Sequence, residues 1–243
     1  MDKQHKMLGV IGGLGPGATA HFMELVIRMT DAKVDQEHLE MLIHNAPATP
    51  DRTQYILDPT KPNPFPKMLR IGKNLACQGA GCIAIPCVTA HYFHKDLEAG
   101  IPVPVINGVR ETVLHLKEHG IQKVGIMATD GTVQAGIFHR ELEAQGMVPV
   151  VPSPDRQADV MHLIFQNIKA GVPPRMELFH RVREELFALG AQGIILGCTE
   201  LSLIKRDYPI GPGFVDAMEV LAQRSVILCG GKLKEEYRCL ITH

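Results

Sequence analysis

Two cysteines with matching local sequences are the side chains of this 243-residue chain best suited to catalysis. Cys87 follows the apolar run in IAIPCVTAH, Cys198 follows the one in IILGCTELS, and a threonine comes soon after each. A thiol placed where a strand ends and a helix begins has a lowered pKa and forms thiolate more readily. Either cysteine alone could equally be a buried core thiol, but the repeated setting favours a shared chemical role.

Two such thiols on opposite sides of a cleft suit the inversion of configuration at a carbon atom. A base removes the proton from one face of the carbon, and a conjugate acid on the other side delivers a proton to the opposite face. The two groups need similar basicity because their roles exchange when the reaction runs backwards. Backbone N–H groups around the carboxylate of the substrate would stabilise the carbanion that develops.

Two loops rich in small residues, GLGPGA at 13–18 and ATDGT at 128–132, could supply those N–H groups. Each loop follows an expected strand and precedes an expected helix, and a helix N-terminus binds small anions such as carboxylates. The first loop also satisfies the dinucleotide fingerprint, but that site requires an acidic residue where the second strand here ends with Asn45. We therefore expect an anion site, with two ordinary helix starts as the alternative.

Apolar runs bounded by turn residues predict the strands that must position these groups. They fall at 7–13, 41–47, 81–87, 103–108, 123–129, 147–153, 192–198 and 214–218. Between most of them lie stretches with helical periodicity, at 17–32, 67–79, 133–146, 159–171 and 175–190. Strand and helix alternate throughout, which predicts an α/β fold with open parallel sheets.

The chain also repeats its own pattern, because GVIGGLGPGAT at 9–19 and VGIMATDGTV at 124–133 both read as strand, loop and helix start. We expect two pseudo-symmetric open parallel-sheet domains. The first comprises residues 1–112 plus 216–243 and carries Cys87, and the second comprises residues 113–215 and carries Cys198. Ligands bind beyond the carboxyl ends of the strands in such sheets, so we expect the active site in the cleft between the domains.

The composition indicates a soluble protein that acts on small molecules. Hydrophobic residues make up 45% and charged residues 21%, and a net charge of −1 provides no strong field to attract nucleic acid or an anionic membrane. No apolar stretch approaches the roughly 20 residues needed to span a bilayer, and the N-terminus lacks the apolar core of a secretory signal. We therefore expect a cytoplasmic protein.

The cysteine and histidine spacings argue against a bound metal. The six cysteines include no C-x-x-C pair that would indicate zinc or a redox couple, and in the cytoplasm we expect them to stay reduced. His91 and His94 stand at i and i+3 on an expected helix, but two ligands without a third nearby are a weak metal signal.

Five segments of the chain resemble the aspartate/glutamate racemase family, in the same order and at similar separations over almost the whole sequence: GVIGGLGPGAT, NAPATPDRTQYIL, IPCVTAH, ATDGT and LGCTELS. The resemblance is closest to the aspartate racemase branch, because Glu200 follows the second Cys-Thr where glutamate racemases have histidine. It implies an enzyme without cofactor, usually dimeric, that inverts the α-carbon of aspartate or glutamate. It also implies that Cys87 and Cys198 act as the paired acid and base.

The resemblance further implies a set of substrate-binding residues. Arg52 and Lys169 match the cations that recognise the side-chain carboxylate, and arginine suits such a grip because its guanidinium pairs with carboxylate in a fork. Contacts to the rest of the amino acid fall on Gly13, Thr89, Thr129, Thr132, Thr199 and Glu200. The alternatives are a solvated arginine in a loop, a lysine without a role in binding, and threonines that only cap helices.

One residue departs from the family pattern. The first motif of the family commonly reads Cys-Asn-Thr, with the asparagine contacting the polar head of the substrate, and this chain has Val88 at that position. Valine cannot make such a contact. The departure leaves open a related racemase or isomerase that acts on another α-acid or a hydantoin, or a non-catalytic protein that binds acidic amino acids.

Overall fold

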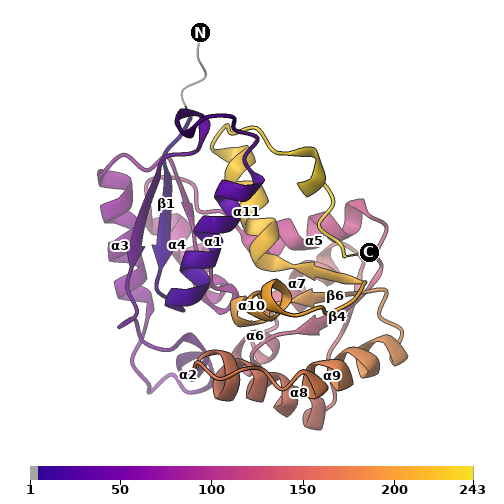
Figure 1. The fold of residues 1–243 in the computed structure, drawn as a ribbon. Helices are drawn as coiled ribbons and strands as arrows, with labels where there is room; N and C mark the ends of the chain where they lie inside the picture. Colours follow the sequence, from indigo (N-terminus) through magenta and orange to yellow (C-terminus); the bar gives the residue numbers. More distant parts are fainter. Residues whose placement is uncertain (1–4, 243) are drawn as a thin grey trace.

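The computed structural model describes residues 5–242 (Figure 1). The first of its two sheets has three parallel strands. The strands are β1 (Leu8–Gly12), β2 (Met41–Asn45) and β3 (Cys82–Ala84), in the order β2-β1-β3. β1 lies in the middle and is buried along its whole length. This burial explains its continuous apolar run, since a central parallel strand is covered on both faces.

The second sheet has four parallel strands: β4 (Lys123–Met127), β5 (Val148–Val150), β6 (Gly193–Leu196) and β7 (Phe214–Asp216), in the order β5-β4-β6-β7. The predicted α/β fold with two parallel sheets is therefore confirmed. The strand predicted at 103–108 is wrong, because that segment forms only a single bridge between Val105 and Ile83. Pro104 has no N–H to contribute to a longer ladder.

Helices connect the strands in the predicted alternation. They are α1 (Pro16–Met29), α2 (Arg52–Leu57), α3 (Phe65–Cys77), α4 (His94–Gly100), α5 (Gly108–Glu118), α6 (Asp130–Gln134), α7 (Ile137–Ala144), α8 (Pro154–Met161), α9 (Met176–Ala188), α10 (Thr199–Asp207) and α11 (Ala217–Leu228). Shorter turns of helix are η1 (Asp35–Glu37), η2 (Val88–Phe93) and η4 (Glu235–Tyr237), and η3 (His162–Ile168) is a π-helix that continues α8.

The helix predicted over 133–146 is two helices, α6 and α7. The chain bends between them at Gly136, whose φ of 61° lies in the left-handed region that glycine adopts without strain. The bend ends α6 after five residues and leaves its first turn, at Thr129 and Thr132, close to the first half of the chain.

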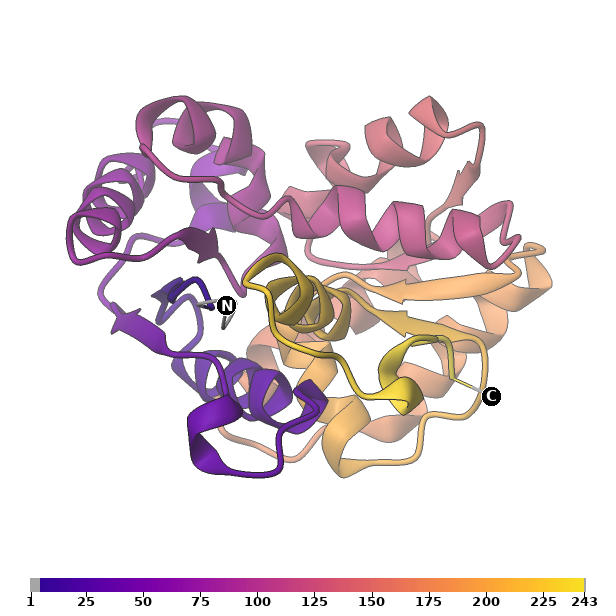
Figure 2. The ribbon, with the colours of Figure 1, turned by 90° about the horizontal axis from the view of Figure 1, so that it is seen from above.

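Helix α11 joins the two halves of the molecule. It packs against α1 and α5, and Figure 2 shows it between the purple first half and the orange second half. A hydrophobic cluster runs through this region and includes Val10 of β1, Ile126 of β4 and Leu221 of α11. Because residues of both sheets bury apolar surface in this cluster, it stabilises the packing of the two halves against each other.

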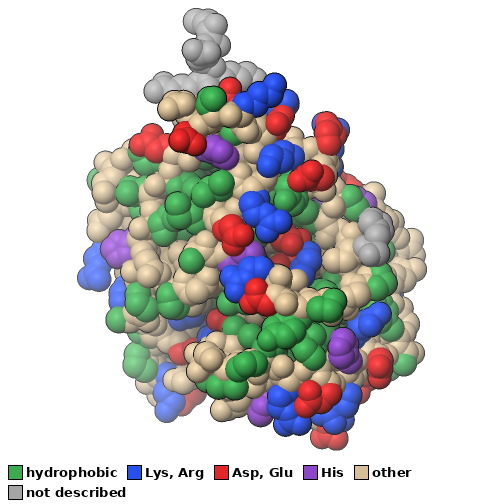
Figure 3. Space-filling model, in the orientation of Figure 1, with side chains coloured by type: hydrophobic (Ala, Val, Ile, Leu, Met, Phe, Trp, Pro, Cys, Tyr) green, Lys and Arg blue, Asp and Glu red, His purple; other side chains and the backbone are tan. Residues whose placement is uncertain are grey.

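The surface carries charges of both signs. Positive and negative side chains are interspersed on the face shown in Figure 3, and their total numbers in the chain nearly balance, at 25 Lys and Arg against 26 Asp and Glu. Among residues 5–242, no helix combines the length and the apolar character needed to cross a membrane.

Candidate active site

The two cysteines lie in one buried cavity although they come from different sheets. Both line a space of about 10 Å³, with Cys87 at 7% exposure and Cys198 at 6%. Cys87 lies three residues beyond the end of β3 and begins η2, and Cys198 lies just beyond β6 and begins α10. The predicted convergence of the cysteines is therefore present, although each stands past the end of its strand rather than within it.

Cys198 is held by a carboxylate. Its Sγ donates a hydrogen bond to Oε2 of Glu200 at 2.9 Å, and the hydroxyl of Thr199 donates to the same oxygen at 3.3 Å. Burial, and then the charge of Glu200, raise the pKa of Cys198 well above its ordinary value. The lowered pKa predicted for this thiol is wrong, because both effects outweigh the helix N-terminus. Cys198 therefore keeps its proton as a thiol at neutral pH.

Cys87 has a cation beside it instead. Arg52 is only 7% exposed, and its guanidinium donates to the carbonyl oxygens of Leu14 at 2.7 Å and of Pro50 at 3.0 Å. Burial alone would lower the pKa of Arg52, but the interaction with Cys87, followed by those with acidic neighbours, raises it. Within residues 5–242 no atom bonds to its buried Nε. Arg52 is therefore not a solvated arginine, and it retains a donor at the site.

Lys169 stands on the side of Cys198. Its Nζ lies 3.8 Å from Oε1 of Glu200 and 4.6 Å from the centre of the Phe165 ring. Burial lowers the pKa of Lys169, but the negative groups around it, Glu200 first, more than compensate and raise it. The two cysteines thus have unlike surroundings: a cation adjoins Cys87, and a carboxylate with its own counter-ion adjoins Cys198.

Buried threonines connect the two halves at the cavity. The hydroxyl of Thr89 lies 3.1 Å from those of Thr129 and Thr132, and the hydroxyl of Thr53 lies 3.3 Å from that of Thr129. Thr129 also caps α6, so capping and a place at the site are compatible. Thr53, Thr89, Thr129 and Thr199 line the cavity, whereas Thr132 does not line it but is hydrogen-bonded to Thr89 and Thr129.

Sequence reasoning missed Thr53, Asp51 and Leu14. All three line the cavity of the cysteines. Asp51 and Thr53 flank Arg52 in the PDRT segment, and Asp51 caps α2 by accepting from the N–H of Gln54. Their position next to Arg52 was the available signal. Leu14 contributes through its backbone carbonyl, which a side-chain motif does not reveal.

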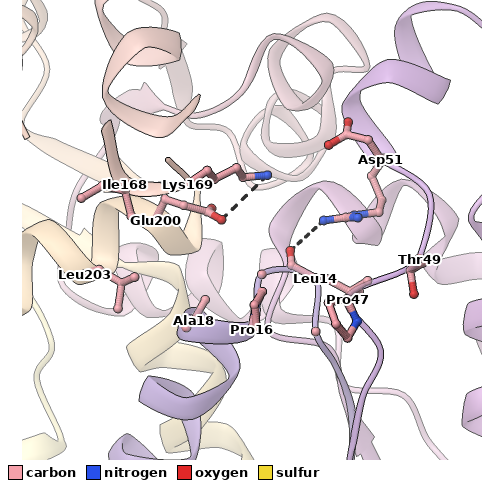
Figure 4. Close-up of a pocket in the computed structure, with 14 residues that line it drawn as sticks. Leu14, Pro16, Ala18, Pro47, Thr49, Asp51, Ile168, Lys169, Glu200 and Leu203 are labelled. Carbon is pink, nitrogen blue, oxygen red and sulfur yellow. Dashed lines mark hydrogen bonds and ion pairs between the residues drawn. The ribbon is translucent and has the colours of Figure 1, made fainter. Parts of the chain in front are cut away.

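A larger pocket of about 440 Å³ opens outside the cavity (Figure 4). Its lining includes the loop 13–18 and the side chains of Arg52, Lys169, Glu200 and Leu203. Arg52, Lys169 and Glu200 line both spaces, so they stand where the outer pocket meets the cavity. The figure shows Lys169 and Glu200 facing Leu14 and Asp51 across this opening.

Gly13 has a structural reason to be glycine. Its φ is +84°, and a Cβ at this position would lie 2.3 Å from the backbone nitrogen of Ala46. Its N–H donates to the hydroxyl of Thr19 at 2.8 Å. Gly13 lines the outer pocket rather than the cavity, and its N–H is already used by the loop itself.

Val88 lies in the wall of the cavity and is 7% exposed. It packs in the hydrophobic cluster that includes Ile106 and Leu221. The side chain that departs from the family pattern therefore gives this wall an apolar surface.

His91 supports the turn that carries Cys87. Its Nδ1 donates to the carbonyl oxygen of Cys87 at 3.1 Å, and its Nε2 accepts from the N–H of Gly108 at 3.0 Å. Burial, and then His94, lower its pKa to about 4, so the ring is neutral. The backbone occupies both ring nitrogens, and His91 and His94 do not form part of any three-ligand group among the described residues.

Comparisons with known proteins identify the family and the fold of this chain. Residues 11–224 match the family described as Asp/Glu/Hydantoin racemase. The chain is 26% identical over 230 residues to the broad specificity amino-acid racemase RacX of Bacillus subtilis, covering 90% of this chain and 96% of that one.

Solved structures of similar fold include the aspartate racemase of Picrophilus torridus, with a TM-score of 0.81, 29% identity, and coverage of 97% of this chain and 99% of that one. An aspartate racemase homologue from Pyrococcus horikoshii has a TM-score of 0.73 at 23% identity, covering 92% and 99% of the two chains.

Proposed function

This chain belongs to the Asp/Glu/Hydantoin racemase family and is an amino-acid racemase, and from that premise we propose that it inverts the α-carbon of aspartate or glutamate between Cys87 and Cys198. The observation that carries the proposal is the single buried cavity in which both thiols stand, each with a charged partner.

In one direction, the thiolate of Cys87 removes the α-proton, and the electron pair of the C–H bond remains on the α-carbon. The thiol of Cys198 then gives its proton to the opposite face, so that a new C–H bond forms and Cys198 is left as thiolate. Arg52 balances the negative charge when it is on Cys87, and Lys169 offsets it when it is on Cys198. In the other direction the two cysteines exchange roles.

The substrate enters through the outer pocket. Arg52 and Lys169 stand at the opening and offer two cations to a side-chain carboxylate. A cavity of about 10 Å³ holds no more than a water molecule, so the amino acid requires the cavity to widen. We propose that it widens by movement between the domain 1–112 plus 216–243 and the domain 113–215.

Hydroxyl groups position the amino-acid head in this proposal. Thr89, Thr129 and Thr199 line the cavity, and Thr132 holds the first two. Gly13 shapes the mouth of the outer pocket, and Glu200 holds Cys198 while it faces the substrate. The family resemblance further supports a homodimer that works without a cofactor, and the composition supports a place in the cytoplasm.

A second candidate substrate class comes from Val88. Its apolar side chain in the cavity wall favours another α-acid or a hydantoin over a substrate whose head needs a hydrogen bond at that place. A panel of both enantiomers of aspartate and glutamate, further α-acids and hydantoins, followed by chiral chromatography, separates the two possibilities.

The test of the proposal is racemisation in D₂O. We expect the α-proton signal of L-aspartate or L-glutamate to disappear and the D-enantiomer to form. Cys87→Ser and Cys198→Ser should each lower the rate by orders of magnitude without unfolding the protein, since a serine hydroxyl is far too weak an acid to replace a thiol. Near-normal turnover in either variant would refute the pairing of the two thiols.

A further inference from the structure

Three metal-ligating side chains meet at the C-terminal end of the chain, away from the cavity of the cysteines. One ring nitrogen each of His115 and His119 and the Sγ of Cys239 lie within 4.8 Å of one another. This is the one group of three such side chains, with this spacing, among residues 5–242. We propose that these three residues bind Zn²⁺ and thereby fasten the C-terminal segment to α5.

The two histidines share one face of a helix. His115 lies near the end of α5, and His119 caps that helix one turn later, so the two side chains point in the same direction. Their ring centres are 4.4 Å apart. A His-x₃-His pair in this arrangement is a common half of a zinc site.

The hydrogen bonds of the rings determine which nitrogens are available. Nδ1 of His119 lies 2.7 Å from the carbonyl oxygen of His115, and a carbonyl only accepts, so Nδ1 carries the proton and Nε2 has the lone pair. Zinc-bound histidines commonly make such an Nδ1–H bond to a carbonyl. Nε2 of His115 accepts from the N–H of Leu240 at 3.1 Å, so this nitrogen is also unprotonated.

The third ligand, Cys239, comes from the C-terminal segment, which packs against α5. Leu240 is buried, and its N–H reaches His115. On the other side of Cys239, the amide of Gln223 donates to the carbonyl oxygens of Tyr237 at 2.6 Å and of Arg238 at 3.3 Å. The backbone is thus held on both sides of Cys239, and Figure 1 shows the yellow C-terminal segment next to α5.

The ligand types suit Zn²⁺. Two imidazoles and a thiolate form a familiar zinc set, with metal–ligand distances of about 2.0–2.3 Å, so the ligand atoms of a tetrahedral site lie roughly 3.5 Å apart. The group must therefore close by about 1 Å from the spacing in the structure, and Nε2 of His115 must exchange its bond to Leu240 for one to the metal. The thiol of Cys239 releases its proton to solvent when the Zn–S bond forms.

Space for a fourth ligand adjoins the group. A cavity of about 380 Å³ is lined by His115, Glu118 and Arg238 among others, and it can admit a water molecule to the metal. None of the three proposed ligands lines the cavity of the cysteines or the outer pocket. The metal would therefore serve the fold rather than the reaction.

The segment that the metal would fasten protects a sheet edge. The N–H of Thr242 donates to the carbonyl oxygen of Phe214, and the carbonyl oxygen of Thr242 accepts from the N–H of Gly213. Ile241 forms a bridge with Val215 in the edge strand β7. Cover on an edge strand prevents its pairing with other chains. Zinc bound only to the folded state would stabilise that cover by mass action.

The experiment titrates tag-free, chelator-treated protein with Co²⁺, which reports tetrahedral thiolate ligation by its visible bands and a near-ultraviolet sulfur-to-metal band. We expect one equivalent to bind, Zn²⁺ to displace it, and Zn²⁺ to raise the Tm. Cys239→Ser should lose the sulfur band, and His119→Ala should weaken binding at least about tenfold and lose the Tm rise. The matched controls are Cys77→Ser, at an exposed cysteine of α3, and His5→Ala, at an exposed histidine.

Three results would overturn the proposal. One is a failure of Co²⁺ and Zn²⁺ to bind the parent protein. Another is a sulfur band that persists in Cys239→Ser and disappears in Cys87→Ser or Cys198→Ser, because the metal would then sit on the catalytic thiols. The third is an unchanged affinity in His119→Ala. Racemisation is measured separately, so failure of the zinc site leaves the proposed reaction unaffected.

Discussion

The carboxylate of Glu200 should control the protonation of Cys198, and Glu200→Gln tests this control. The substitution removes the negative charge but retains a side chain of the same shape with an oxygen that can accept the thiol proton. Because the charge of Glu200 helps to raise the pKa of Cys198, its removal should lower that pKa. Cys198 should then lose its proton at a lower pH than in the parent protein.

The size of the effect follows from the distance. Two unit charges 2.9 Å apart, the separation of Cys198 Sγ and Glu200 Oε2, repel by about 6 kcal/mol at an effective dielectric constant of about 20. Lys169 stands 3.8 Å from Glu200 and offsets part of this repulsion. If only a quarter remains, about 1.4 kcal/mol, the ratio of thiolate to thiol at Cys198 still changes roughly tenfold.

The assay is the pH dependence of kcat/KM from both enantiomers. For the enantiomer whose α-proton Cys198 removes, Cys198 is the base and sets the acid limb; for the enantiomer whose α-proton Cys87 removes, Cys198 is the acid of the free enzyme, and the alkaline limb reports loss of its proton. We expect Glu200→Gln to move this limb to lower pH. Lys169→Met is the matched control with the opposite sign, because Lys169 lowers the pKa of Cys198 and its removal should move the limb to higher pH. An unmoved limb in Glu200→Gln, or the same direction in both variants, would refute the reasoning.

Three further outcomes are expected. Arg52→Ala should weaken dicarboxylate binding, measured by calorimetry, by roughly tenfold to several hundredfold, and Arg52→Lys should weaken it less. An affinity equal to that of the parent protein would contradict the role of Arg52 in binding the carboxylate. Val88→Asn should raise kcat/KM for aspartate or glutamate in initial-rate assays, and slower turnover of both would show that the cavity is adapted to valine. Burial, and then Asp216, raise the pKa of Glu219 from 4.5 to about 7 in the folded protein. As pH rises, this carboxyl therefore loses its proton at a lower pH in the unfolded protein than in the folded one. The free energy of unfolding in urea should therefore fall as pH rises between these values, and Glu219→Gln should flatten the slope; an unchanged slope would contradict this.

Much of this protein could be predicted from local patterns. Apolar runs of strand length, alternating with helical periodicity, predicted two parallel sheets because each pattern is set by residues near one another in the chain. The matched settings of Cys87 and Cys198 predicted that the two thiols meet, since ligands bind beyond the carboxyl ends of parallel strands and those ends of two sheets can face one cleft. The five motifs predicted the family, which the match over residues 11–224 confirms.

Local patterns could also mislead about elements. The run at 103–108 is apolar enough for a strand, but one proline reduces it to a bridge, and the helical pattern at 133–146 breaks at Gly136. Both segments have the hydrophobic pattern of the predicted element. The missing N–H of Pro104 prevents the strand, and the left-handed φ of Gly136 divides the helix.

The chemical state of the site depended on tertiary structure. A helix N-terminus lowers the pKa of a thiol, yet Cys198 has a raised one because folding buries it and brings its sulfur against Glu200. Arg52 could be read as solvated until folding placed it against Leu14 and beside Cys87. Burial and charge pairing depend on which distant segments meet, and no window of sequence contains that information. The sequence therefore determined which groups were present, and the tertiary structure determined their protonation and their partners.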